Sequence, residues 1–197
     1  GYTINDPLTY QTASVSRASI AFSKSYAAYG QVTWAVTEPL RITVGGRYTR
    51  DEKNGRLFTV NGAATNLTFN QENNRFDPLA VIAWQVNPDI NVHAKYATGY
   101  RAGGASSRSL TYLSFGPEEV KSYEVGLKSE LFDRKVRFNL AGYIMDRSDT
   151  QVDFNFFLPQ PNGTVRNTLE TVNAAGITKI RGIEADLTVR PLEGLSM

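Results

Sequence analysis

The stretch "AYGQVTWAVTEPLRITVGGRY", Ala28–Tyr48, alternates along its length around one short break. Its even-numbered positions are apolar or small on both sides of Thr37–Pro39, whereas its odd-numbered positions are mostly polar. A period of two is typical of a strand with one apolar and one polar face. Because Thr-Glu-Pro suits a tight turn, the stretch predicts two antiparallel strands joined as a hairpin.

The same alternation recurs through the rest of the chain. Three more runs show it cleanly and two show it in mixed form, and we find no convincing helix. The clean runs are Ile90–Tyr96, Tyr123–Leu131 and Ile183–Val189, and the mixed runs are Phe76–Val86 and Val136–Ile144. The sequence therefore predicts an all-β protein.

The connections between these runs alternate in length. The short, turn-forming connections are Thr37–Pro39, Asn87–Asp89, Phe132–Lys135 and Arg190–Gly194. The long polar links are Lys53–Arg75, Ala102–Glu119 and roughly Arg147–Gly176. Tight turns at one end of long strands and long loops at the other end are typical of an antiparallel transmembrane β-barrel. A soluble sandwich usually has strands of only ~5–6 residues.

Aromatic residues mark two heights on the expected apolar face. Trp34 and Trp84 each lie shortly before a tight turn, on the apolar parity. Tyr48 and Tyr96 lie on the same parity toward the long links. Since membrane barrels carry aromatic girdles at both interfaces, we predict that these four residues belong to the girdles.

The composition excludes several classes of function. The 197 residues include no cysteine and one histidine, His93, and the net charge is +2. We therefore expect no disulfide, no metal site, no catalytic residue, no covalently bound cofactor and no nucleic-acid partner. His93 lies on the polar parity, and we expect it to be a hydrogen-bonded wall residue rather than a ligand.

The segment "YATGYRAGGASS", Tyr96–Ser107, is close to a phosphate-binding loop, G-x-x-x-x-G-K-[ST]. Ala105 stands where that motif has lysine, and no helix is predicted to follow whose N-terminus could hold a phosphate. We interpret Gly99 as the point where a strand leaves the bilayer and becomes an extracellular loop.

Four segments resemble the barrel of TonB-dependent outer-membrane receptors. They are "YATGYRAGGASS", "SYAAYGQVTWAVTEPLRITVGGRYTRDEK" (Ser25–Lys53), "FGPEEVKSYEVGLKSELFDRKVRFNLAGYIMDRSDTQ" (Phe115–Gln151) and "VNAAGITKIRGIEADLTVRPLEGL" (Val172–Leu195). The resemblance implies part of a 22-stranded barrel. We count about seven strands, with an eighth beginning at Leu195. We expect residues 1–197 to be an incomplete barrel domain without the family's plug, and to be unstable alone because its sheet edges are open.

The resemblance also implies a location and partners. We expect the outer membrane of a Gram-negative bacterium, with the surrounding lipid as one partner. It further implies import of a scarce nutrient, most often a ferric-siderophore chelate. The energy would come from the TonB–ExbB–ExbD complex through the missing plug.

We predict two groups of functional side chains, one in the loops and one on the lumen wall. The loop residues combine cationic and aromatic groups that suit an anionic, aromatic-bearing chelate: Arg101, Arg108, Tyr112, Phe115, Phe154, Phe156 and Phe157. The wall residues would face the plug or channel: Glu124, Lys128, Glu130, Glu184 and Asp186. The alternatives are that the aromatics only pack the loops, and that the charges are only hydrated.

Two other functional classes stay open at this point. A passive porin or small complete barrel of about eight strands would share the alternation and loop pattern. A soluble, secreted β-sandwich that binds a ligand would share the alternation alone.

Overall fold

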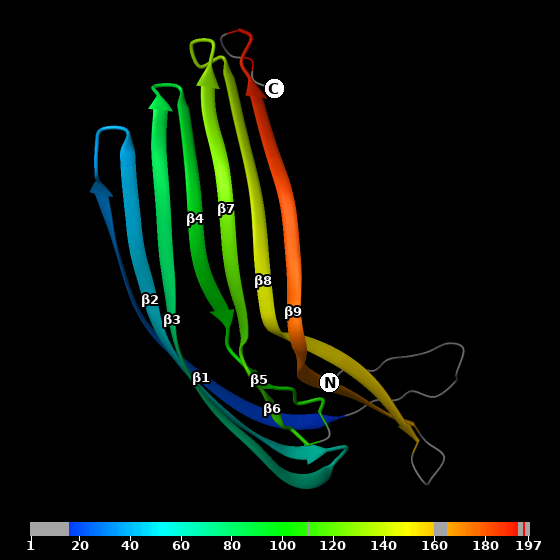
Figure 1. The fold of residues 1–197 in the computed structure, drawn as a ribbon. Helices are drawn as coiled ribbons and strands as arrows, with labels where there is room; N and C mark the ends of the chain where they lie inside the picture. Colours follow the sequence, from blue (N-terminus) through cyan, green and yellow to red (C-terminus); the bar gives the residue numbers. More distant parts are fainter. Residues whose placement is uncertain (1–15, 110, 160–164, 193–194, 196–197) are drawn as a thin grey trace.

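The computed structural model describes residues 16–109, 111–159, 165–192 and 195. The strands are β1 (Arg17–Ala35), β2 (Leu40–Val60), β3 (Ala63–Asn87), β4 (Ile90–Arg101), β5 (Gly104–Ala105), β6 (Ser114–Phe115), β7 (Glu118–Leu131), β8 (Val136–Pro159) and β9 (Val165–Val189). Seven of them form one antiparallel sheet in the order β1-β2-β3-β4-β7-β8-β9, and β5 pairs with β6 (Figure 1). This confirms the predicted all-β antiparallel wall and its seven strands.

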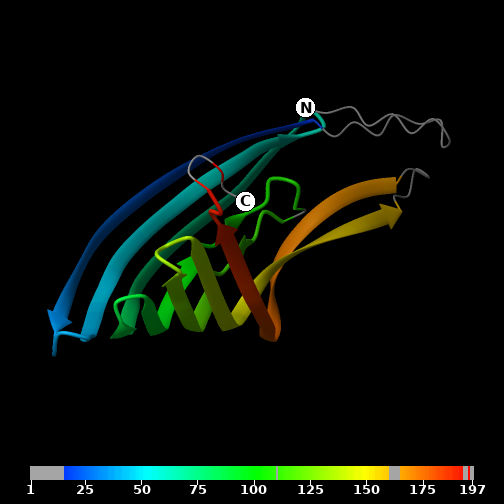
Figure 2. The ribbon, with the colours of Figure 1, turned by 90° about the horizontal axis from the view of Figure 1, so that it is seen from above.

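The sheet is a single curved layer that does not close on itself. Seen from above, it forms an arc, and the β5–β6 segment lies inside the arc of β1–β3 (Figure 2). The connections β1–β2, β3–β4 and β7–β8, which the sequence predicts as tight turns, lie together at the upper end in Figure 1. Leu195 forms an isolated bridge with Leu192, and the predicted start of an eighth strand there lies at the edge of the described residues.

Two of the predicted long links are wrong, because they are strands. Lys53–Arg75 belongs to β2 and β3, which meet at a tight Asn61–Gly62 turn. Both turn residues have positive φ, 50° and 77°, as an Asn-Gly hairpin turn requires. Arg147–Gly176 likewise lies largely in β8 and β9. A strand segment with polar surroundings on both faces needs no apolar side, so the alternation disappears although the strand continues.

The end of the β8–β9 hairpin farthest from the tight turns, at the lower right of Figure 1, bends away from the wall. The bend coincides with a register shift between Ser148 and Thr150. Asp149 and Gly176 have positive φ there, 53° and 102°. A bulge of this kind inserts an unpaired residue and turns the strand. The hairpin therefore leaves the arc at a defined point.

The two faces of the wall differ in character. Residues of one parity carry large exposed apolar side chains, such as Val44 on β2 and Val125 on β7. The other parity points into the arc, because it contacts the β5–β6 segment through residues such as Lys53 and Gln71. Among the described residues, only Leu57 and Tyr112 are buried hydrophobic side chains. The backbone ladders, rather than a core, hold the sheet together, and the apolar outer face is left for lipid.

Candidate functional site

The site begins where β4 separates from β3. Their ladder ends at the pair Leu79–Ala97, and the next residue of β3 is Pro78, which has no amide hydrogen. The hydroxyl of Thr98 instead donates to Asp77 Oδ1 at 3.0 Å. β4 and β7 stay paired to the end of β4, so they leave the wall together and pass inside it.

A charged network fixes this inward displacement. Arg75 on β3 forms ion pairs with Asp77, at 3.2 Å, and with Glu119 at the start of β7. The hydroxyl of Tyr100 donates to the carboxylate of Asp51 on β2. Burial, and then the hydrogen bond and negative charge of Asp51, raise the pKa of Tyr100, which lies beyond the Tyr96 girdle position. The phenol therefore stays a hydrogen-bond donor at neutral pH.

The wall strands β2 and β3 also hold the inner segment, residues 102–109 and 111–117. Lys53 Nζ donates to the carbonyl of Gly103 at 2.8 Å, and Gln71 Nε2 donates to the carbonyl of Phe115 at 2.7 Å. The rings of Phe69 and Tyr112 meet edge to face at 5.2 Å between centroids. Tyr112 is only 2% exposed, and burial raises the pKa of its phenol.

The bent hairpin holds the inner segment from the other side. Asn173 on β9 accepts from the amide of Gly116 at 2.6 Å and lies within donating distance of the carbonyls of Gly116 and Pro117. The side-chain Nε2 of Gln151 on β8 donates to the Gly116 carbonyl at 3.0 Å. The backbone amide of Gln151 donates to Glu118 Oε2 at 2.8 Å. The inner segment is therefore fixed at both flanks.

A cavity of about 460 Å³ lies between the wall and this segment. Its lining includes Lys53 and Phe69 from the wall, Arg101 and Phe115 from the inner part, and Gln151 from the bent hairpin. Within the described part of the chain, the Arg101 guanidinium forms no ion pair or hydrogen bond. The cavity thus combines this guanidinium with three aromatic residues, Phe22, Phe69 and Phe115, and the side-chain amide of Gln151.

The structure brings some of the predicted loop residues together and separates others. Arg101 and Phe115 line the cavity, Arg108 is exposed outside it, and Tyr112 is buried in the packing against Phe69. Phe154, 46% exposed, lies on the bent hairpin. Phe156 and Phe157 lie on the same strand, but their side chains are outside the described set. Ligand contact by these seven residues stays a prediction.

Lys53, Phe69 and Gln151 also line the cavity, although they were not among the predicted site residues. All three fall within the segments Lys53–Arg75 and Arg147–Gly176, which were predicted to be long links. The Asn61–Gly62 turn, which sets the register of β2 against β3, is a signal that could have located Lys53 and Phe69. We find no comparable signal for Gln151 on β8.

The predicted lumen residues do share the inner face. Glu124 lies 3.2 Å from His93 Nε2, and Glu130 forms an ion pair of 2.9 Å with Arg137. The remaining members are exposed there: Lys128, Glu184 and Asp186. His93 is thus hydrogen-bonded in the wall, while contact of the five charged residues with a plug or channel stays a prediction.

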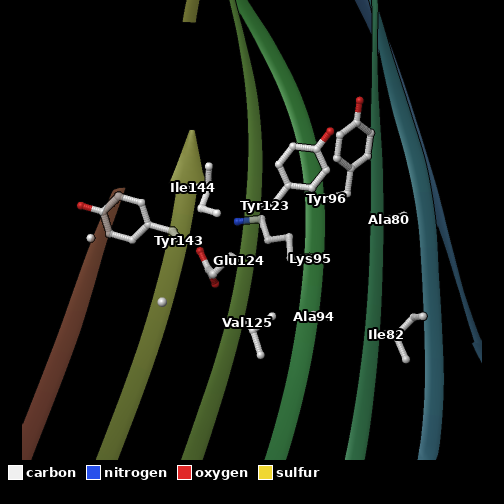
Figure 3. A pocket seen from close by; sticks show the side chains of 12 residues that line it. Ala80, Ile82, Ala94, Lys95, Tyr96, Tyr123, Glu124, Val125, Tyr143 and Ile144 are labelled. Carbon is white, nitrogen blue, oxygen red and sulfur yellow. The ribbon is translucent and has the colours of Figure 1, made fainter. Parts of the chain in front are cut away.

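The predicted girdle residues all project from the outer face. Trp34 and Trp84 are 64% and 51% exposed and lie in adjacent rows of the sheet near the tight turns. Tyr48 is 50% exposed, and the ring of Tyr96 lies 5.1 Å from that of Tyr123 (Figure 3). Their position fits two girdles, and their depth in a bilayer stays a prediction.

The described residues contain no group of three or more His, Asp or Glu side chains that could hold a metal ion. Nor does any helix in the described ranges have the length and apolarity to cross a membrane.

The fold and the inner site together define a class of protein, the wall of an outer-membrane barrel that encloses a polar interior. The family description "TonB dependent receptor-like, beta-barrel" matches residues 1–196. The chain belongs to the TonB-dependent receptor family, whose members are transport receptors rather than enzymes, and it is an outer-membrane protein.

Two curated relatives show the same relationship in sequence. The ferric-pyoverdine M114 receptor PbuA of Pseudomonas sp. (strain M114) is 27% identical over 139 residues, which cover 67% of this chain and 17% of the receptor. The probable TonB-dependent receptor BfrD of Bordetella pertussis is 26% identical over 156 residues, covering 75% and 21%. The chain thus spans about a fifth of the length of these relatives.

Solved structures share the fold. The ferric yersiniabactin uptake receptor FyuA of Yersinia pestis superposes with a TM-score of 0.75 at 20% identity, over 92% of this chain and 26% of that one. The copper transporter OprC superposes with a TM-score of 0.66 at 16% identity, over 88% and 27%.

Proposed function

We propose that this chain is part of the barrel of a receptor that imports a ferric-siderophore complex, with energy supplied through TonB. The observation that carries the proposal is the cavity beside the inner segment. Arg101, whose guanidinium has no ion-pair partner among the described residues, lines it together with Phe69 and Phe115. A cation beside aromatic rings suits a chelate that carries anionic groups and an aromatic or apolar frame.

The curated relatives support the choice of ligand class. PbuA and the ferripyoverdine receptor of Pseudomonas aeruginosa, 27% and 22% identical to this chain, are receptors for ferric pyoverdines by name. The structural neighbours add support for the fold alone, since they include both the yersiniabactin receptor and a copper transporter.

In this proposal the residues of the chain bind and position the ligand. Arg101 would pair with an anionic group of the chelate, while Gln151 would accept or donate one hydrogen bond from the opposite side. Lys53 is 2.8 Å from the Gly103 carbonyl, so its first role is to hold the cavity wall. A cavity fixed on both flanks binds with little ordering cost, which favours affinity.

The test uses the complete receptor that contains this chain, expressed in a Gram-negative host that lacks its own siderophore receptors. Uptake of radioactive iron is measured with a panel of ferric siderophores, in the presence and absence of TonB. We expect uptake of at least one chelate, and its loss without TonB. Uptake that persists without TonB would support the passive porin instead.

The role of the cavity is tested with Arg101→Gln in the same receptor, by measuring the binding of the transported chelate to whole cells. We expect at least about tenfold weaker chelate binding, because a charge-assisted pair contributes roughly 1.5–3 kcal/mol. The matched control is Arg56→Gln, which removes an exposed arginine from the face of β2 that points away from the cavity. Equal binding by the two variants would contradict the assignment of this cavity.

A further inference from the structure

Asparagine followed by glycine occurs three times in the chain, and the structure describes two of these pairs. Asn54–Gly55 lies within β2, Asn61–Gly62 forms the β2–β3 turn, and Asn162–Gly163 is outside the described residues. In such a pair the backbone nitrogen of glycine can attack the side-chain Cγ of asparagine and close a five-membered ring, since glycine has no side chain to obstruct the approach. The two described pairs share this chemistry and differ in their surroundings.

The pair within β2 is enclosed by its neighbours. Gly55 pairs with Ala21 on β1 and with Phe69 on β3. A Cβ placed on Gly55 would lie 2.6 Å from Phe69 Cε1 and 2.8 Å from the carbonyl oxygen of Ile20. The backbone nitrogen of Gly55 therefore reaches the Asn54 side chain only when the strands open locally.

The pair in the turn is open to water. The turn lies at the lower end of Figure 1, away from the tight turns, and both Asn61 and Gly62 are exposed. A Cβ placed on Gly62 would meet no atom within 4 Å. The Gly62 amide also forms no hydrogen bond within the described part of the chain. The nitrogen that would attack is therefore not held in a strand ladder.

Ser16, just before β1, holds the Asn61 side chain. The Asn61 amide donates to the Ser16 carbonyl at 2.7 Å, and the Ser16 amide donates to Asn61 Oδ1 at 3.0 Å. When the ring closes, negative charge develops on Oδ1, and a donor that already points at this oxygen stabilises the charge. Asn61 Nδ2, which would leave as ammonia, has no hydrogen-bond partner among the described residues. The turn thus combines an unbonded nucleophile, an oxyanion donor and an unrestrained leaving group.

We propose that Asn61 is a site of spontaneous deamidation in the folded protein. The Gly62 nitrogen gives up its proton to water and forms a bond to Asn61 Cγ. The Cγ–Nδ2 bond breaks, and Nδ2 leaves with that proton as ammonia. Water then opens the succinimide ring at either carbonyl, which gives an aspartyl or an isoaspartyl residue. The reaction consumes one water, releases one ammonia and needs no oxidant, and it does not depend on which ligand the receptor imports.

The two products affect the hairpin differently. Asp-Gly favours the same two-residue turn as Asn-Gly, so an aspartyl residue keeps the pair Val60–Ala63. An isoaspartyl residue adds one carbon to the main chain, and a two-residue turn cannot absorb it. It should therefore loosen the pairs nearest to the turn, Val60–Ala63 and Thr59–Ala64. Both products place a carboxylate where the chain had a neutral amide.

The test follows both asparagines in the complete receptor, folded in a nonionic detergent and incubated at pH 8 in water enriched in oxygen-18. Peptide mass spectrometry measures the conversion, and incorporated heavy oxygen marks conversion that occurred during the incubation. We expect Asn61 to convert at least about tenfold faster than Asn54, because tenfold requires a ladder opening that costs only about 1.4 kcal/mol. In the receptor unfolded with urea, the two asparagines should convert at the same rate, since both precede glycine.

Three variants separate the parts of the site. Ser16→Pro removes the amide that donates to Asn61 Oδ1, and it should slow conversion of Asn61 about two- to tenfold in the folded receptor and not in the unfolded one. Asn61→Gln keeps a side-chain amide but lengthens the ring that must close, so conversion at this position should stop. The matched control is Asn54→Gln, which should leave the rate at Asn61 unchanged.

Equal conversion of Asn54 and Asn61 in the folded receptor would overturn the proposal, and so would an unchanged rate in Ser16→Pro. A difference between the two asparagines that persists after unfolding would show that the flanking sequence selects the site, and it would also overturn the proposal.

Discussion

Asn173→Ala should loosen the inner segment from the bent hairpin. The Asn173 side chain accepts from the amide of Gly116 at 2.6 Å, and its Nδ2 lies 3.1 Å, 3.3 Å and 2.8 Å from the carbonyls of Gly116, Pro117 and Asp149. An amide nitrogen carries two hydrogens, so at most two of these three donor contacts are full hydrogen bonds.

The expected magnitude follows from this count. Three hydrogen bonds at about 1 kcal/mol each give about 3 kcal/mol, and the exposed one, to Asp149, contributes less. We therefore expect local opening of the segment to become about 2 kcal/mol easier. That is about 30-fold in the opening equilibrium, since about 1.4 kcal/mol corresponds to tenfold.

Hydrogen exchange followed by mass spectrometry on the complete receptor measures this opening. Amides that exchange through local opening should exchange about 30-fold faster in peptides covering residues 102–117, and unchanged in peptides covering the β1–β2 turn. Asn173→Asp is an informative second variant, because it keeps the acceptor for Gly116 and loses both donors. The matched control is Asn139→Ala, which loses a single contact of 3.5 Å to Asp186. Unchanged exchange in residues 102–117 would refute the idea that Asn173 fixes the segment.

Three further predictions concern the wall around the site. Leu57→Ala should lower the free energy of unfolding by about 2 kcal/mol, as measured by urea unfolding in lipid vesicles. This value is at the low end for a fully buried leucine, because the sheet is a single layer. Tyr100→Phe should lower the free energy of unfolding by about 2 kcal/mol, because the Asp51 carboxylate loses this hydrogen-bond donor. Because the pKa of Tyr100 is raised, this contribution is complete below the ordinary tyrosine pKa of about 10 and falls only as the pH rises above that value. The difference in the free energy of unfolding between wild type and Tyr100→Phe should therefore be equal at pH 7 and pH 9. Arg75→Ala should accelerate hydrogen exchange at the start of β7, because Glu119 loses its ion-pair partner. Arg75→Lys should retain part of the protection against exchange.

The sequence predicts the part of each strand that meets lipid, and little beyond it. Within the bilayer one face must be apolar, so alternation reveals β1, β2 and their tight turn. Above the bilayer water satisfies both faces, and the strand segments around Asn61–Gly62 and beyond Arg147 look like loops. The Asn-Gly pair was the available signal, and it marks a turn only when the flanking residues are read as strands.

The candidate site was predictable only in part, for a different reason. Arg101 and Phe115 attract attention because they are cationic and aromatic residues in a loop. Lys53 lies fifty residues earlier in the chain and reaches Gly103 only because β4 passes inside β2 and β3. Likewise Tyr112 looks like a ligand residue in sequence, whereas the edge-to-face contact with Phe69 buries it. Such contacts depend on the path of the chain in space, which local patterns do not encode.

The path itself depends on one interruption in the wall. A strand paired on both sides can present only its side chains to the lumen, so a cavity bounded by backbone needs a strand that leaves the sheet. The β3–β4 ladder ends beside Pro78, and the Thr98–Asp77 hydrogen bond closes the gap at the point of departure. β7 leaves with β4 because their own ladder continues to Arg101–Glu118. The Arg75–Glu119 pair then ties the displaced strands to the inner face. A proline in the middle of an otherwise regular strand is therefore the sequence feature that links the barrel wall to its candidate binding site.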